Sequence, residues 1–346
     1  AGLAGVPAAQ GCAAGQQVDV SDSEFEQDLQ SLAAFGQGTW NINDQWSLTL
    51  GGRYTSDDKT GSFSNAINNP FVTALSIRAA DSQPNLDSSD YGDTDAFTYF
   101  ANASYFPNAD VMVFGTISSG FKSGGFNSEG VFPALTREQR GFGPETTTNY
   151  ELGIKSQLFD NSLQLNATLF RMDIEDFQDR AFDGISFVTR NAGELRQQGL
   201  ETDFIWAPLD QLTLTGGLSY LDSEFQDYTN ASPLPGGAPQ DLSGKSAHFS
   251  PEWQGSLVAD WADTFTPISG TEYYLRGETQ YMGDHNAGGN TNQNPQSEQD
   301  AYQLFNARLG LRADDKSWEV NLWGRNLGDE GYCRAIFAQP FGAQLR

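Results

Sequence analysis

The chain has 346 residues, and its 45 acidic residues against 19 Lys and Arg give a formal net charge of −26 at pH 7. This charge excludes nucleic acid as a partner, because phosphate binding requires basic patches. No apolar run approaches the roughly 18 residues of a membrane-spanning helix. The opening residues, AGLAGVPAAQGC, lack the charged start and apolar core of a signal peptide. If the protein is exported, we therefore expect this chain to be a mature fragment or to begin mid-protein.

Apolar and polar residues alternate along paired segments of the chain, and a period of two predicts strands. Short turns join the members of six expected pairs, which are 31–40 with 46–56, 95–106 with 110–118, the two arms of 149–176, 194–206 with 212–224, 252–262 with 272–283, and 302–313 with 317–327. Long polar connections follow the pairs, at 57–93, 119–146, 178–193, 226–246, 285–300 and from 328 onward.

The strict sorting of short turns and long connections favours a bacterial outer-membrane barrel, with short periplasmic turns and long extracellular loops. Each apolar stripe covers about ten residues, which a tilted strand needs to cross the lipid. Trp46 and Tyr54 stand at opposite ends of one stripe, as two interfacial aromatic girdles require. We therefore predict an all-β fold, an antiparallel transmembrane β-barrel.

The hairpin at 149–176 shows the pattern most clearly. Tyr150, Leu152 and Ile154 share one face of its first arm, and a two-residue Asp160–Asn161 connection predicts a tight turn. Arg171 is in phase with the apolar residues of the second arm. It is expected either to face outward and reach the lipid phosphates, or to follow a bulge that resets the phase.

Four phrases carry a family resemblance: GFKSGGFN (120–127), PETTTNYELGIKSQLFDNSLQLNATLFRMDIEDFQ (144–178), RNAGELRQQGLETDF (190–204) and WEVNLWGRNLGDEGYCRAIF (318–337). In wording, order and spacing they resemble TonB-dependent outer-membrane receptors. The resemblance implies a barrel of about 22 strands closed by an N-terminal plug, of which this chain supplies about 12 strands and no plug. Residues 1–346 would then be a partial barrel domain that starts in an extracellular loop and ends in the last one.

The resemblance implies an energised importer in the cell outer membrane. Its loops would bind a scarce solute, most often a ferric siderophore, and the TonB complex would act through the missing plug and TonB box. Outer-membrane lipid, including lipopolysaccharide, would surround the barrel, and a small-molecule iron chelate would be the ligand. The alternatives are a passive porin-like or structural barrel and a secreted soluble β protein.

The sequence shows no catalytic constellation. His248 and His285 are the only histidines, neither has a companion at metal-ligand spacing, and no nucleophile motif is present. We therefore expect no enzyme activity, no cofactor and no metal site. Charged residues on the polar faces of the strands are expected to pair across neighbouring strands; they are Arg53, Glu151, Lys155, Glu201, Asp203, Arg276, Glu278, Arg308, Arg312, Glu319 and Arg325.

The resemblance gives Glu151 and Glu201 a further role, because glutamates at these positions in the family face plug arginines and help to seat the plug. Ligand contacts are expected in the loops. The candidates are Lys122, Phe126, Asn127, Arg137, Arg140, Phe142 and His285. The mixture of aromatic and basic residues at 119–146 would suit an aromatic, anionic iron chelate, although several of these residues could instead be structural. Cys333 could pair within the last loop or with Cys12.

Overall fold

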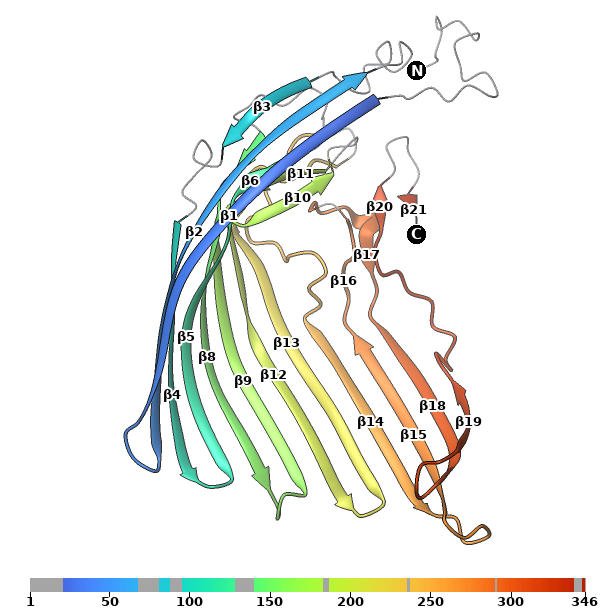
Figure 1. Cartoon of the computed structure of the whole chain (residues 1–346). Coiled ribbons are helices and arrows are strands. Elements are labelled where there is room, and N and C mark those ends of the chain that lie inside the picture. The colour runs from blue at the N-terminus through green and yellow to red at the C-terminus, as the bar shows by residue number, and fades with distance from the viewer. Residues whose placement is uncertain are drawn as a thin grey trace, which may run out of the picture.

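The computed structural model of the chain describes residues 21–67, 81–87, 95–127, 140–182, 187–234, 237–289, 291–338 and 344–345. One curved antiparallel sheet runs through it, with the strand order β1-β2-β4-β5-β8-β9-β12-β13-β14-β15-β18-β19 (Figure 1). Its strands are β1 Ser21–Asn41, β2 Trp46–Ile67, β4 Asp95–Asn108, β5 Val111–Lys122, β8 Glu145–Leu158, β9 Leu163–Glu175, β12 Glu194–Leu209, β13 Leu212–Asp227, β14 Trp253–Thr264, β15 Thr271–Met282, β18 Tyr302–Ala313 and β19 Glu319–Gly324. The predicted antiparallel strand pairs are confirmed.

Short secondary elements lie at the end of the sheet opposite the tight turns, inside or above the long connections (Figure 1). They are β3 Asp81–Asp87, which pairs with β2, and the pairs β6 Gly125–Phe126 with β7 Gly141–Phe142, β10 Gln178–Phe182 with β11 Phe187–Asn191, β16 His285–Asn286 with β17 Glu298–Gln299, and β20 Phe337–Ala338 with β21 Gln344–Leu345. Among the described residues, no helix is long and apolar enough to cross a membrane.

The boundaries of several strands differ from the sequence prediction, and β1 begins ten residues earlier than expected, at Ser21. β2 continues to Ile67 through the first third of the expected 57–93 connection, because its backbone stays paired with β1 up to Ser21. Residues 57–67 of β2 and the paired start of β1 show no alternation of apolar and polar residues, so the sequence did not predict this pairing. The turn between β8 and β9 spans 159–162 rather than two residues, with Phe159 at φ 54°, Asp160 at 55° and Asn161 at 66°. β19 ends at Gly324, earlier than expected.

The two faces of the sheet have opposite character, as the alternation predicted. Large apolar side chains point outward from the convex face and are exposed, including Leu152 (58%), Leu169 (55%) and Leu309 (54%). Leu152 and Leu169 lie directly opposite each other on β8 and β9. A water-soluble protein rarely exposes so wide an apolar band, because contact with water is unfavourable. The convex face is therefore the lipid-facing one.

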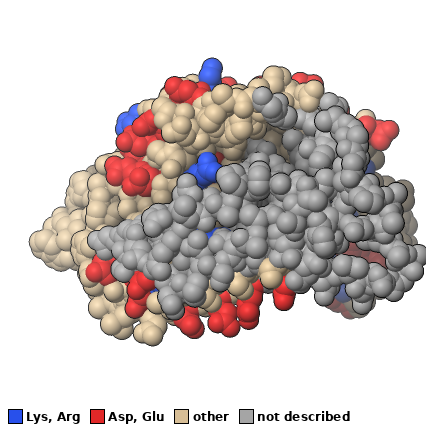
Figure 2. All heavy atoms as spheres, turned by 90° about the horizontal axis from the view of Figure 1, so that it is seen from above, with Lys and Arg blue, Asp and Glu red and all other residues tan. Residues whose placement is uncertain are grey.

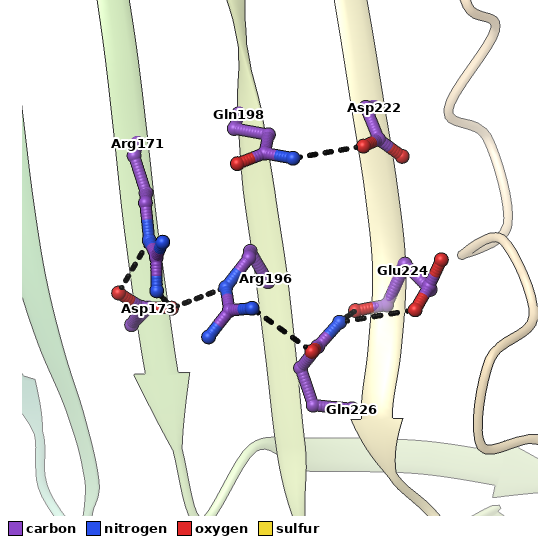
Figure 3. Close-up of polar contacts among 7 residues, drawn as sticks. All are labelled: Arg171, Asp173, Arg196, Gln198, Asp222, Glu224 and Gln226. Carbon is purple, nitrogen blue, oxygen red and sulfur yellow. Dashed lines mark hydrogen bonds and ion pairs between the residues drawn. The ribbon is translucent and has the colours of Figure 1, made fainter.

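Arg171 also faces outward, and the register of β9 with β8 and β12 runs through it without a bulge. Above the apolar band it begins a polar network across three strands (Figure 3). Asp173 accepts hydrogen bonds from Arg171 Nε at 3.0 Å and from Arg196 Nε at 2.7 Å. Arg196 in turn donates to Gln226 Oε1 at 3.0 Å. The bulge alternative is wrong, and this network marks the upper limit of the apolar surface.

The largest cluster of buried apolar residues lies at the loop end of the sheet, not between two sheets. It joins inward-facing residues of β9, β12 and β13 to the following loops, and consists of Ile174, Ala192, Leu195, Phe225, Tyr228, Ala231, Leu242 and Ala247. Seen from this end, Asp and Glu are scattered along the described rim, with fewer Lys and Arg (Figure 2). The loops thus pack inward on the concave face and leave an acidic rim.

Candidate functional site

The two glutamates predicted to seat a plug lie on the concave wall. Glu151 of β8 stands opposite Phe170 of β9, and Glu201 of β12 stands opposite Thr168 of the same strand. With β9 between them, the two carboxylates lie on strands about 10 Å apart. Glu201 is exposed, whereas Glu151 is half-buried and accepts a hydrogen bond from Asn149 Nδ2 at 2.8 Å. Both can receive a partner from inside the barrel, and their plug contact stays a prediction.

The predicted pairing of wall charges is confirmed for two arginines. Arg276 of β15 forms an ion pair with Asp260 of β14 at 2.9 Å. Arg312 of β18 pairs with Glu272 of β15. These pairs lie across neighbouring strands, as expected from cross-strand side-chain contacts.

Asn127 and Arg140 form a reciprocal clasp across the connection between β5 and β8. The backbone N and side-chain Nδ2 of Asn127 donate to the Arg140 carbonyl oxygen at 2.8 and 3.0 Å. Arg140 Nη1 donates to the Asn127 carbonyl oxygen at 3.0 Å. The guanidinium carbon of Arg140 lies 3.9 Å from the ring centroid of Phe63, a cation–π contact with β2. Because Arg140 is fully buried and Asn127 is 6% exposed, the contacts described support a structural role for both.

Side-chain amides connect this loop to the β10–β11 hairpin. The side-chain amide of Asn127 donates to the Thr189 carbonyl oxygen at 2.9 Å and accepts from the Thr189 N–H at 2.7 Å. These two bonds resemble the pair of backbone hydrogen bonds between two antiparallel strands. Gln178 Nε2 donates to the Gly143 carbonyl oxygen at 2.9 Å. Asn191 Nδ2 donates to the same oxygen at 3.0 Å. Sequence reasoning missed Gln178 and Asn191; the only signal was their position inside two of the family-like phrases.

Asp179 connects three segments at the loop end of the sheet. This buried carboxylate of β10 accepts a hydrogen bond from Tyr228 Oη in the 228–246 loop at 2.5 Å. Its other oxygen accepts from Thr291 Oγ1 in the 285–300 loop at 2.5 Å. Burial, and secondarily the charge of Asp179, raises the pKa of Tyr228, so that its hydroxyl stays a donor. Sequence reasoning missed this node, because its members are far apart in the chain.

A cavity of about 390 Å³ lies beside Asp179, and we take it as the candidate solute site among the loops. Asp179, Arg190 and Asp227 supply charged groups to its lining. Amide, hydroxyl and proline residues from 228–239 close the opposite side. The lining combines charges of both signs with apolar side chains such as Val188, so it fits a solute that carries both polar and apolar groups.

Two of the other predicted ligand residues, Phe126 and Phe142, lie in the paired strands β6 and β7 beside Asn127 and Arg140. Lys122 is exposed at the end of β5, and Phe142 is half-buried in β7. Phe126 packs against Phe63 and is 7% exposed. His285 is half-buried, and its Nδ1 lies 2.9 Å from the Gly283 carbonyl oxygen. Arg137 lies outside the described residues. The structure thus brings Phe126 and Phe142 close to the Asn127–Arg140 clasp, whereas His285 belongs to β16. The ligand contact of all these residues stays a prediction.

The second histidine and the cysteines also have definite positions. His248 is half-buried, and its Nδ1 lies 3.1 Å from the Gly288 carbonyl oxygen. Burial is the largest cause that lowers its pKa. Cys333 is half-buried and forms no disulfide with any described residue, while Cys12 lies outside the described ranges. No cluster of three or more His, Cys, Asp or Glu in the described part of the chain could hold a metal ion.

Comparisons with known proteins agree with this architecture. The family described as TonB dependent receptor-like, beta-barrel matches residues 6–327. The ferric-pyoverdine M114 receptor PbuA of Pseudomonas sp. (strain M114) is 29% identical over 205 residues, which is 58% of this chain and 23% of that protein. The pesticin receptor of Yersinia pestis is 25% identical over 307 residues, 88% of this chain and 40% of that protein. This chain spans less than half the length of both relatives.

Solved structures share the fold. The ferric yersiniabactin uptake receptor FyuA from Yersinia pestis superposes with a TM-score of 0.72 at 19% identity, covering 94% of this chain and 44% of that one. The siderophore receptor PiuA from Acinetobacter baumannii gives 0.67 at 20% identity, covering 92% and 42%. Together with the meander of strands and the apolar convex face, the family match shows that this chain belongs to the TonB-dependent receptor β-barrels of the outer membrane.

Proposed function

We propose that the complete protein is an energised importer that binds a ferric siderophore at its extracellular loops. The observation that carries this proposal is the interlocked loop cluster around Asp179, which holds a cavity of mixed polar and apolar lining above a lipid-facing wall. Rigid loops of this kind present a preformed site to solute from outside the cell. Relatives named as siderophore receptors support the class of ligand.

We further propose that residues 1–346 are part of a larger barrel domain of about 22 strands. Among the described strands, β1 and β19 each pair on one side only. An unpaired strand edge is unfavourable in lipid, because its backbone groups have no hydrogen-bond partners there. Further strands of the complete protein would satisfy both edges, and a plug inside the barrel would contact Glu151 and Glu201. TonB would act on that plug, and lipopolysaccharide would contact the convex face near Arg171.

Uptake of radiolabelled iron tests the importer proposal. Iron-starved cells would produce the complete protein as their sole receptor and receive a panel of ferric siderophores. We expect accumulation of at least one chelate, and its loss when TonB is deleted. Accumulation that persists without TonB would support the passive porin-like alternative instead. A lack of uptake for every chelate, with the protein present in the outer membrane, would contradict a siderophore as the solute.

A further inference from the structure

We propose that the concave wall formed by β15, β18 and β19 binds a small anionic solute through Arg276, Arg308 and Arg325. The inference rests on the importer proposal and deepens it, because it assigns a charge to the imported solute. A cavity of about 610 Å³ lies on this part of the wall. Four arginines contribute to its lining, the three above and Arg334, against a single acidic residue, Glu278. In a chain of net charge −26 this is an unusual concentration of positive charge.

Strand register places two of these arginines side by side. Arg276 of β15 lies directly opposite Arg308 of β18. Arg308 lies opposite Trp323 of β19. Like charges directly opposite each other on one face of a sheet are destabilising. An anion between them would remove that repulsion, and the fork of an arginine can hold a carboxylate or phosphate through two hydrogen bonds.

Arg325 extends the positive surface toward the loops. It follows Trp323 by two residues and so belongs to the same face, and its guanidinium carbon lies 5.3 Å from the Trp323 ring centroid. Above it, Tyr302 and Tyr332 stack with ring centroids 4.4 Å apart. Arg334 adjoins Tyr332. The arginines thus form a column from the extracellular loop toward the middle of the wall.

The column is only partly neutralised within the described part of the chain, because the charge of Glu319 acts on Arg308, which also contacts the Tyr274 hydroxyl. Arg276 has its ion pair with Asp260, but no described carboxylate forms an ion pair with Arg308, Arg325 or Arg334. Glu278, the acidic residue of the cavity, accepts hydrogen bonds from Gln280 Nε2 at 2.7 Å and from Asn306 Nδ2 at 3.3 Å. Arg308 and Arg325 are exposed, so their donors can reach a solute.

Charge complementarity selects a solute with two or more negative groups, such as carboxylates, catecholates or phosphates. The acidic rim in Figure 2 would repel such a solute, so a concentrated positive surface below it is needed for capture. Carboxylates of another segment lying inside the barrel are the competing occupant. The experiment below separates these two possibilities.

Quenching of Trp323 fluorescence measures the accessibility and the charge of this wall. The complete protein, purified in detergent, is compared with Trp323→Phe to isolate the Trp323 signal. The anionic quencher is iodide and the neutral quencher is acrylamide. We expect iodide quenching about 3-fold stronger than in an Arg308→Gln/Arg325→Gln variant, because a potential of about one kT or more concentrates anions locally. Quenching by acrylamide should be the same in the wild type and in the Arg308→Gln/Arg325→Gln variant, because acrylamide is uncharged.

Protection by citrate tests whether the arginines form a binding site for an anion or only raise the electrostatic potential of the wall. Millimolar citrate should protect Trp323 from iodide more than sodium chloride at equal ionic strength does, and the double variant should lose this protection. Arg171→Gln, on the convex face and likewise removing an exposed arginine, is the matched control and should behave like the wild type.

Two results would overturn the proposal. Equal iodide quenching with and without the two arginines, or no specific effect of citrate, would show that the wall does not bind anions. Failure of both quenchers to reach Trp323 would show that another segment of the protein covers the column. Neither result depends on iron uptake, so failure of this inference is distinguishable from failure of the importer proposal.

Discussion

Asp179 receives hydrogen bonds from Tyr228 and Thr291, which belong to two other loops of the extracellular end. The clasp between Asn127 and Arg140 works similarly, since each residue bonds the backbone of the other. At this end of the molecule, buried polar side chains hold segments that share few apolar contacts. These hydrogen bonds favour one arrangement of the loops, because a buried donor or acceptor left without a partner lowers the free energy of unfolding by about 1–3 kcal/mol.

Replacing Asp179 by Asn should loosen all three loops. An amide has one acceptor oxygen in place of two, so either the Tyr228 or the Thr291 hydroxyl would lose its acceptor, at a cost of about 1–3 kcal/mol. Hydrogen exchange of the 228–246 loop should become faster by about 10-fold or more. Asp284→Asn, which replaces an exposed carboxylate that belongs to neither the Asp179 node nor the 228–246 loop, is the control and should leave exchange of this loop unchanged. Unchanged exchange in Asp179→Asn would exclude Asp179 as the connecting residue.

Acid should loosen the loops around His248. Burial lowers the pKa of this imidazole below its ordinary value of 6.5, although the charges of Asp179 and Glu298 act in the opposite direction. The folded state therefore favours neutral His248 and loses stability as the pH falls from the ordinary pKa toward the lowered one. Protection from hydrogen exchange near Gly288, after correction for the intrinsic pH dependence of amide exchange, should therefore decrease as the pH falls below about 7. A His248→Gln variant that retains the same acid sensitivity would contradict this assignment.

At the scale of the element, each strand separates lipid from the barrel interior by the direction of consecutive side chains. On β9, Ala167 faces outward opposite Ile154, while the next residue inward, Asn166, donates to Asp203 Oδ2 at 2.8 Å. Neighbouring residues of one strand therefore have different surroundings: the apolar one faces lipid and the polar one faces the barrel interior. Arg171 does not contradict this rule, because it lies above the apolar band and bonds Asp173.

Adjacent substitutions on β9 should consequently differ in their effect. Ala167→Arg places a charge in the middle of the lipid-facing band and should destabilise the complete protein in lipid vesicles by about 2–4 kcal/mol. Asn166→Arg, directed inward next to Asp203, should change stability by less than about 1 kcal/mol. Denaturant titration of both variants in vesicles measures the difference. Equal destabilisation by the two would mean that the faces have been assigned wrongly.

At the scale of the whole molecule, the curved wall is open on both sides within the described strands. The proposed plug would lie against its concave face at Glu151 and Glu201. These glutamates can accept paired hydrogen bonds from arginines. The barrier to large solutes therefore depends on how firmly the plug is held.

Removing both glutamates should weaken that barrier. Cells producing the complete protein with Glu151→Ala and Glu201→Ala should become more sensitive to vancomycin, which is too large for ordinary porins, by about 4-fold or more if the lost pairs contributed about 1 kcal/mol. Glu175→Ala, on the outward parity of β9, is the matched control. Sensitivity equal to that of the wild type, with both proteins present at equal amounts, would contradict the plug contact.

The amino-acid sequence by itself determined the positions and the facing of the strands. Alternation is a local property with a period of two residues, so Leu152 and Glu151 were assigned to opposite faces correctly. The outward direction of Arg171 also followed from parity, although the absence of a bulge did not. The family-like phrases indicated a receptor, but they did not show which of their residues hold loops together.

Only the tertiary structure decided the contacts between distant segments. The part of β1 and β2 beyond residue 56 is mostly polar apart from Phe25 and Phe63, which lie opposite each other, so backbone pairing rather than an alternating side-chain pattern extends it. Asp179, Tyr228 and Thr291 meet through the packing of three loops, and Arg276 meets Arg308 through strand register. Such contacts depend on the placement of segments far apart in the chain, and neither spacing nor composition encodes that placement locally.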